Sequence, residues 1–156
     1  MSELMLNPAK SMALTGHRKV DLSLDIDNLK KVFLGLIDKG FENFFIGMAV
    51  GFDTIAFNVL EDIRKQKDIK LIACIPCPEQ AKNFDYKEKA EYDRMLESAN
   101  EKVILSPHYT KLCFINRNRY MVDNSSVLVA YVREKKGGSY QTKLYAKKKG
   151  ITIIEV

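Results

Sequence analysis

Long apolar runs are missing from the sequence, and none reaches the ~20 residues that a membrane-spanning helix requires. The first ten residues, MSELMLNPAK, lack the basic flank and the apolar stretch of a secretory signal. Only three cysteines are present, an odd number that does not make a disulfide framework, so reduced thiols are the natural state. We therefore expect a cytoplasmic protein with no membrane partner.

Several motifs of cofactor and metal chemistry are also absent. The sequence contains neither the dinucleotide fingerprint G-x-G-x-x-G nor the phosphate loop G-x-x-x-x-G-K-S/T, which argues against a P-loop NTPase. Cys74 and Cys77 have C-x-x-C spacing, but they follow a strand pattern and no second cysteine pair completes a zinc site. His17 and His108 are the only histidines and form no recognisable catalytic triad. We expect no bound metal and no resident cofactor.

What is present is ordinary for a globular protein. The 156 residues are 46% hydrophobic and 29% charged, which suits one folded domain spanning residues 1–156. The formal net charge of +5 is compatible with anionic partners such as nucleotides, nucleic acids or lipid head groups, without choosing among them.

Short apolar runs alternate with amphipathic stretches along the chain. The runs predict six strands, and the 3.6-residue spacing of apolar residues between them predicts five helices. Strands are expected at residues 11–14, 44–46, 69–75, 102–105, 127–132 and 152–154, and helices at 25–39, 52–63, 86–98, 114–123 and 139–149. This alternation predicts an α/β fold with a mostly parallel sheet covered on both faces. Ligands of such sheets bind beyond the carboxyl ends of the strands, where the strand order reverses.

The first predicted strand is followed by Thr15, Gly16, His17 and Arg18. Glycine lets the backbone turn and approach a ligand, and the planar guanidinium of Arg18 suits phosphate. The alternative is a solvated turn with an incidental basic residue.

The second predicted strand is followed by Gly47, Met48 and, three residues on, Gly51, in a tight connection to an amphipathic helix. The free N–H groups of this connection and the positive end of the helix dipole predict a phosphate cradle. Asp53 would repel a phosphate placed close to it. We expect Asp53 either to cap the helix or to accept a hydrogen bond from a ribose hydroxyl.

The fifth predicted strand leads to a second glycine-bearing helix start, Gly137 and Gly138, where Ser139 is the expected N-cap. Ser139 and Thr142 add hydroxyl groups beside the backbone amides. The alternative is a hydrophilic loop with a good N-cap. Two such helix starts at one sheet favour a bound phosphate or ribose.

Two arginines lie on the helix expected before the fifth strand. Arg117 and Arg119 project about 200° apart on a helix, so only one of them reaches the cleft. The other is expected to pair at the surface.

Taken together, these motifs resemble the YpsA-like family of small bacterial and prophage proteins, in the SLOG (Smf/DprA–LOG) superfamily of Rossmann-like folds. The resemblance rests on Thr15-Gly16-His17-Arg18 and on residues 47–56, 75–84, 117–131 and 137–150, in that order. It implies a single Rossmann-like, three-layer domain that binds a nucleotide-derived ligand, such as ADP-ribose or a nucleoside phosphate. It also implies homo-oligomers, since many members of the superfamily are dimers or larger.

The LOG enzymes of that superfamily remove the base from nucleoside monophosphates with an arginine and a glutamate. Arg117 falls where that arginine would be, and Gly137 and Gly138 match the Gly-Gly turn, but the glutamate has no counterpart. Glycosyl transfer needs a carboxylate near the anomeric carbon. Asp53 is the one candidate for a catalytic residue.

Three hypotheses follow. The first is a non-enzymatic binder of a nucleotide-derived ligand, with a sensor or sequestering role, for example in phage–host conflict. The second is a nucleotide N-glycosidase that uses Arg117 and Asp53. The third is a DNA-binding module of DprA type, disfavoured because the chain offers no continuous groove of basic and aromatic residues.

Overall fold

The computed structural model describes residues 6–156. The first five residues of the expected 1–156 domain, which also belong to the segment compared above with a secretory signal, lie outside the described residues. The strands are β1 (Ser11–Gly16), β2 (Asn43–Ile46), β3 (Lys70–Ile75), β4 (Glu101–Ile104), β5 (Val127–Tyr131) and β6 (Thr152–Glu155). The α-helices are α1 (Ile26–Asp38), α2 (Phe52–Arg64), α3 (Tyr86–Ser98), α4 (Cys113–Asp123) and α5 (Gly138–Lys149), and a 3-10 turn, η1 (Pro8–Lys10), precedes β1.

All six strands form one parallel sheet in the order β4-β3-β2-β1-β5-β6. The chain builds outward from β1 to β4 and then returns to the other side of β1, so the strand order reverses between β1 and β5. This arrangement confirms the predicted α/β, Rossmann-like fold, and its sheet is parallel throughout rather than mostly parallel.

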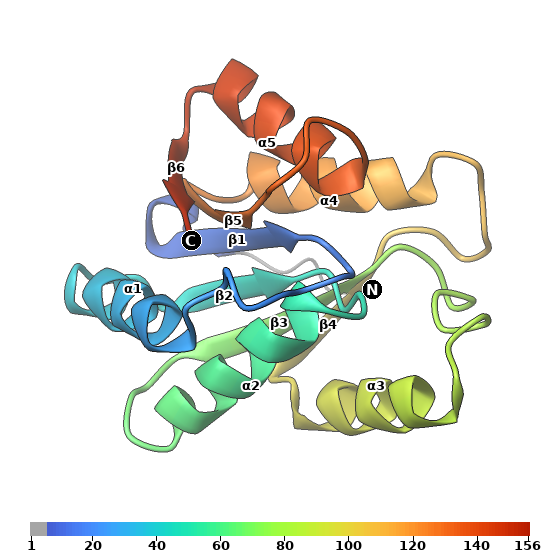
Figure 1. The fold of residues 1–156 in the computed structure, drawn as a ribbon, viewed down its shortest axis with the longest axis horizontal. Coiled ribbons are helices and arrows are strands. Elements are labelled where there is room, and N and C mark those ends of the chain that lie inside the picture. The colour runs from blue at the N-terminus through green and yellow to red at the C-terminus, as the bar shows by residue number, and fades with distance from the viewer. Residues whose placement is uncertain (1–5) are drawn as a thin grey trace.

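Helices cover both faces of the sheet, as Figure 1 shows. Successive strand residues point to opposite faces, so Met12 and Leu14 join one core with α1, α2 and α3, whereas Ala13 joins the other with α4 and α5. Phenylalanines fill the larger core, where Phe33 of α1 meets Phe44 of β2 edge to face. Two cores against one sheet make the three layers that the family resemblance implied.

The N-cap residues of two helices differ from the sequence expectation. The N-cap of α2 is Gly51 and the N-cap of α5 is Gly137, so Asp53 and Ser139 both lie inside the first turn and cap nothing. Both glycines have a positive φ, of 93° and 89°, which redirects the chain where each helix begins. The capping roles expected for Asp53 and Ser139 were therefore wrong.

No helix in residues 6–156 combines the length and the apolar character that crossing a membrane demands.

Candidate functional site

A cavity of about 460 Å³ opens at the carboxyl ends of β1 and β5, where the strand order reverses. We call it the switch-point cavity. Nine of the residues expected at the site line it: Thr15, Gly16, His17, Arg18, Asp53, Arg117, Gly137, Gly138 and Ser139. The carboxyl-edge rule for parallel sheets thus locates a real hollow.

The four other expected residues lie elsewhere. Met48 and Gly51 line a neighbouring hollow between α2 and α3, and Thr142 lines one between α4 and α5. Gly47 packs below the cavity, against the Arg117 side chain. Met48 is fully buried with a φ of 66°, a left-handed conformation that costs a non-glycine residue about 1–3 kcal/mol.

Two glycines near the cavity allow other parts of the chain to pack closely against them. A Cβ at Gly16 would overlap the ring of Phe52, and a Cβ at Gly51 would overlap the backbone carbonyl of Arg18. The loop after β1 and the start of α2 therefore lie in direct contact, and the Phe52 N–H donates a hydrogen bond to the His17 carbonyl at 3.1 Å.

Gly47 has the same kind of role. A Cβ at this position would lie 2.9 Å from Nη1 of Arg117, whose guanidinium donates to the Gly47 carbonyl. The positions that side chains at Gly47 and Gly51 would occupy are filled by protein atoms. We call residues 47–51 the closed glycine turn.

Gly137 and Gly138 are different. A Cβ at either position would meet no atom of the described residues within 4 Å. Because Gly137 carries no side chain, α5 begins with no side-chain cap from its N-cap residue, and its first-turn N–H groups border the cavity. We call residues 137–138 the open glycine turn.

His17 ties the two loops of the cavity together. Its Nε2 accepts a hydrogen bond from the backbone N–H of Arg133 at 2.7 Å, and its Nδ1 lies 3.0 Å from Oγ of Ser139. An accepting Nε2 requires the neutral ring with the proton on Nδ1, which then donates to Ser139. His17 thus holds the open glycine turn in place rather than presenting a free ring nitrogen to the cavity.

Asp53 has an incomplete hydrogen-bond shell in the wall of the switch-point cavity. Asp53 is only 6% exposed, and its Oδ2 accepts a hydrogen bond from the Ala49 N–H at 3.1 Å. Oδ1 has no hydrogen-bond partner in residues 6–156. Burial raises the pKa of Asp53 to about 6, although the nearby Arg117 charge and the Ala49 N–H oppose the rise. A buried acceptor without a partner favours a ligand donor at this point.

Arg117 forms the floor of the cavity and is only 5% exposed. Nη1 donates to the carbonyls of Gly47 and Cys74, the latter at 3.4 Å, and Nε donates to Oδ1 of Asn118 at 2.7 Å. Burial lowers the pKa of Arg117, and the Asp53 charge opposes this shift. Among the nitrogen atoms of this guanidinium, Nη2 alone makes no hydrogen bond within residues 6–156. The side chain therefore mainly holds the closed glycine turn, and its positive charge compensates the negative charge of Asp53.

Sequence reasoning missed the polar support beneath the closed turn. Nε2 of Gln80 donates to the Gly47 carbonyl at 2.8 Å, and the Tyr92 hydroxyl donates to Oε1 of Gln80 at 3.0 Å. Gln80 lies between β3 and α3, and its burial depends on tertiary contacts that no local sequence pattern signals. Asn118 was also missed, and it lines the cavity beside Arg117.

A sequence model of the YpsA family, described as the YspA SLOG family, matches residues 12–152. The chain belongs to the YpsA family. It is 25% identical to the UPF0398 protein YpsA of Bacillus subtilis (strain 168) over 142 residues, covering 82% of this chain and 79% of the relative. It is likewise 25% identical to a UPF0398 protein of Listeria monocytogenes serotype 4a over 162 residues, covering 94% and 90%.

Solved structures share the fold. DNA processing protein A (DprA) of Streptococcus pneumoniae superposes with a TM-score of 0.68 at 19% identity, over 94% of this YpsA-family chain and 50% of that chain. DprA of Helicobacter pylori, described with a single-stranded DNA binding mode, gives 0.66 at 21% identity, over 96% and 65%. The chain thus spans about half to two thirds of these DprA chains.

The site of this YpsA-family chain is lined by charged side chains of both signs, which suits the binding of a polar ligand. Two carboxylates, Asp53 and Glu134, and three cations, Arg18, Lys136 and Arg117, line the cavity. Residues 6–156 contain no group of three or more His, Cys, Asp or Glu side chains arranged to hold a metal ion. Burial raises the pKa of the Cys74 thiol to about 12, which makes this cysteine a core residue rather than a nucleophile.

Proposed function

We propose that the switch-point cavity binds a nucleotide-derived ligand, with a phosphate at the start of α5 and a sugar hydroxyl at Asp53. The observation that carries the proposal is the unpartnered Oδ1 of Asp53 in the same cavity as the open glycine turn. The end of the cavity at Asp53 suits a hydrogen-bond donor, and the end at the start of α5 suits an anion. A sugar phosphate has both groups.

The phosphate end is argued from the start of α5. The first-turn N–H groups of a helix and its dipole attract anions, and no side chain from the N-cap competes for them here. The missing side chains at Gly137 and Gly138 leave space for a phosphate to contact the backbone. Lys136 and Arg18 at the rim add positive charge.

The sugar end is argued from Asp53. A carboxyl group with a pKa of about 6 is mainly ionised at neutral pH and accepts hydrogen bonds only. It repels a phosphate, so the phosphate lies at the α5 end of the cavity and the hydroxyl-bearing ring lies at Asp53. A binder of this kind suits a sensor or a sequestering protein.

Thermal-shift measurements test this proposal. The purified protein is titrated with ribose 5-phosphate, AMP, GMP, CMP, ADP-ribose, NAD and a short single-stranded oligodeoxynucleotide. A ligand that binds only the native state raises the free energy of unfolding by about 2.7 kcal/mol at 100 times its Kd. We expect at least one sugar phosphate to raise Tm, and no response to any of them would contradict the proposal.

Asp53 also favours a second candidate function, nucleotide N-glycosidase activity. A buried carboxylate beside a sugar site can stabilise an oxocarbenium-like transition state. This reading is weaker, because Glu134, the second carboxylate of the cavity, is exposed at the rim. Chromatographic detection of free base from a nucleotide, lost in Asp53→Asn, would favour the enzyme over the binder.

A further inference from the structure

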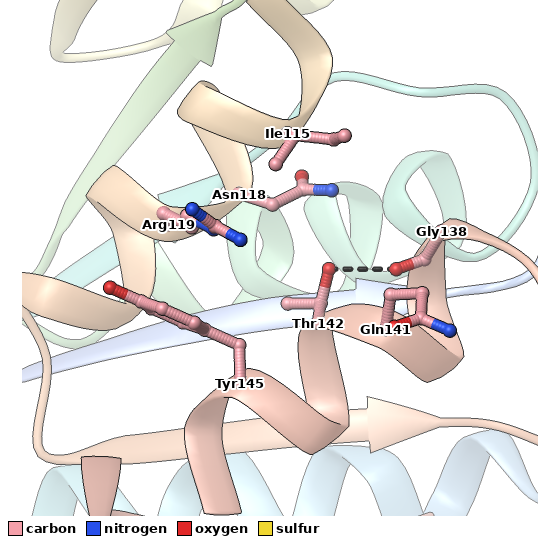
Figure 2. Close-up of a pocket in the computed structure, with 7 residues that line it drawn as sticks. All are labelled: Ile115, Asn118, Arg119, Gly138, Gln141, Thr142 and Tyr145. Carbon is pink, nitrogen blue, oxygen red and sulfur yellow. Dashed lines mark hydrogen bonds between the residues drawn. The ribbon is translucent and has the colours of Figure 1, made fainter. Parts of the chain in front are cut away.

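A second hollow of about 460 Å³ lies between α4 and α5. We call it the interhelical hollow, and its lining is shown in Figure 2. Asn118 and Gly138 line both this hollow and the switch-point cavity, so the two spaces adjoin at the open glycine turn. A ligand held at that turn can therefore reach both sides.

Helical spacing explains the composition of the hollow. Ile115, Asn118 and Arg119 recur at i, i+3 and i+4 on α4. Gly138, Gln141, Thr142 and Tyr145 recur at i, i+3, i+4 and i+7 on α5. In Figure 2 the two stripes face one another, with Asn118 on α4 above Thr142 on α5. The arginines that project to different sides of α4 thus serve different spaces, Arg117 the switch-point cavity and Arg119 the interhelical hollow.

Flat and apolar surfaces form part of the wall. The Arg119 guanidinium lies over the ring of Tyr145 at 5.1 Å, and the Tyr145 hydroxyl donates to Oδ1 of Asp123 at 2.7 Å. These contacts fix the orientation of the ring. Ile115 is 47% exposed on the opposite helix. A planar ring between them would bury apolar surface on both sides.

Unused donors complete the lining. Within residues 6–156 neither the Arg119 guanidinium nor the Gln141 amide has a hydrogen-bond partner. Oδ1 of Asn118 is occupied by Arg117, which leaves its Nδ2 as a donor. No carboxylate from the described part of the chain lines this hollow. Such a lining suits a ring with acceptor atoms on its edge, as a purine has.

We propose that the interhelical hollow holds the heterocyclic ring of a second ligand arm. The ligand then has two arms joined by phosphate over Gly138, one arm reaching Asp53 and the other lying between α4 and α5. This inference rests on the proposed function of the switch-point cavity. ADP-ribose has this two-armed shape, and ribose 5-phosphate has only the arm that reaches Asp53.

Calorimetric titrations with these two probes test the inference. Ile115→Trp places a larger side chain in the interhelical hollow and leaves the switch-point cavity untouched. We expect ADP-ribose to bind the wild type at least tenfold more tightly than ribose 5-phosphate. We expect Ile115→Trp to lower the affinity for ADP-ribose at least tenfold. The affinity for ribose 5-phosphate should stay within twofold of the wild-type value.

Leu144→Trp is the matched control, because Leu144 is also part-exposed, at 40%, and lines neither space. It should bind both probes like the wild type. If ribose 5-phosphate binds but ADP-ribose is no tighter, or if Ile115→Trp weakens both equally, the second arm is contradicted while the proposed function stands. If neither probe binds, the second arm is contradicted, and the proposed function is then decided by the other nucleotides of the thermal-shift titration. Tighter binding of a single-stranded oligodeoxynucleotide than of ADP-ribose would assign the two arms to a nucleic acid strand instead.

Fluorescence provides a second measurement that does not depend on filling the hollow. The sequence contains no tryptophan, so Tyr145→Trp introduces a single reporter in the wall. Stacking of a base on the indole should quench its emission when ADP-ribose is added, and ribose 5-phosphate should not. The same indole at position 144, one residue away, should respond to neither probe; equal quenching at both positions would overturn the proposal.

Discussion

The closed glycine turn and the open glycine turn have the same sequence character and opposite surroundings. Both lead from a parallel strand into a helix whose N-cap is a glycine with a φ near +90°. At residues 47–51 the space of the missing side chains is filled by Arg117 and by the Arg18 carbonyl, whereas at residues 137–138 it is empty of described atoms. Glycine thus allows close packing within the chain at one turn and leaves room for a ligand at the other.

The largest expected effect comes from comparing Gly51→Ala with Gly137→Ala. Both replacements force an alanine into a positive φ, which costs about 1–3 kcal/mol. Only at Gly51 would the new Cβ also overlap the Arg18 carbonyl. We expect Gly51→Ala to lower the free energy of unfolding by at least about 2 kcal/mol more than Gly137→Ala does.

Urea unfolding of the two variants and the wild type measures this difference. Equal losses of stability would mean that the closed turn is not packed as described, and the comparison would fail.

The next effect is expected in the pH dependence of Asp53→Asn. The folded state raises the pKa of Asp53 from 3.8 to about 6, so it holds this proton more tightly than the unfolded state does. The contribution of Asp53 to stability is therefore full below pH 3.8 and is lost as the pH rises through about 6. Asparagine does not titrate. Between pH 4 and pH 7 the free energy of unfolding of the variant should rise relative to the wild type by up to roughly 3 kcal/mol.

Denaturation curves at several pH values, with both proteins in the same buffers, give this difference directly. Parallel pH profiles would show that Asp53 ionises as an ordinary exposed carboxylate and would remove it from the cavity wall.

His17 links the loop after β1 to the open turn, and its loss should have a modest effect. His17→Ala removes the hydrogen bonds to Arg133 and Ser139, and we expect stability to fall by about 1 kcal/mol. Ser139→Ala removes only one of them and should cost less. Thermal unfolding of the two variants tests this order, and a larger loss in Ser139→Ala would reverse the assigned roles.

Most of the fold could be predicted from the sequence, because each element carries its own pattern. The helical repeat from Phe52 to Ile63 and the apolar run from Leu71 to Ile75 depend on burial alone, and both elements lie where expected. Helix starts were harder, since a glycine N-cap with positive φ leaves no polar side chain as a signal. The side chains of Asp53 and Ser139 therefore suggested caps that the backbone does not use.

The lining of the site was predictable, but the roles within it were not. Its residues follow strand ends, and the parallel order brings those ends together. Whether Gly16 makes room for a ligand or for Phe52, 36 positions later in the chain, depends on a tertiary contact that no local pattern encodes. The burial of Arg117 against Gly47 is of the same kind. The sequence therefore predicts the location of the site at the strand ends. It does not predict which glycine borders open space and which one packs against the protein.

The central claim is that the open glycine turn receives a phosphate. Gly138→Val tests it most directly, because a Cβ at this position meets no described atom within 4 Å and the change replaces glycine at the first residue of α5. Its free energy of unfolding should stay within about 0.5 kcal/mol of the wild type. Calorimetric titration with ribose 5-phosphate and ADP-ribose should show at least a tenfold loss of affinity for both. Wild-type affinity in a stably folded Gly138→Val protein would contradict the account.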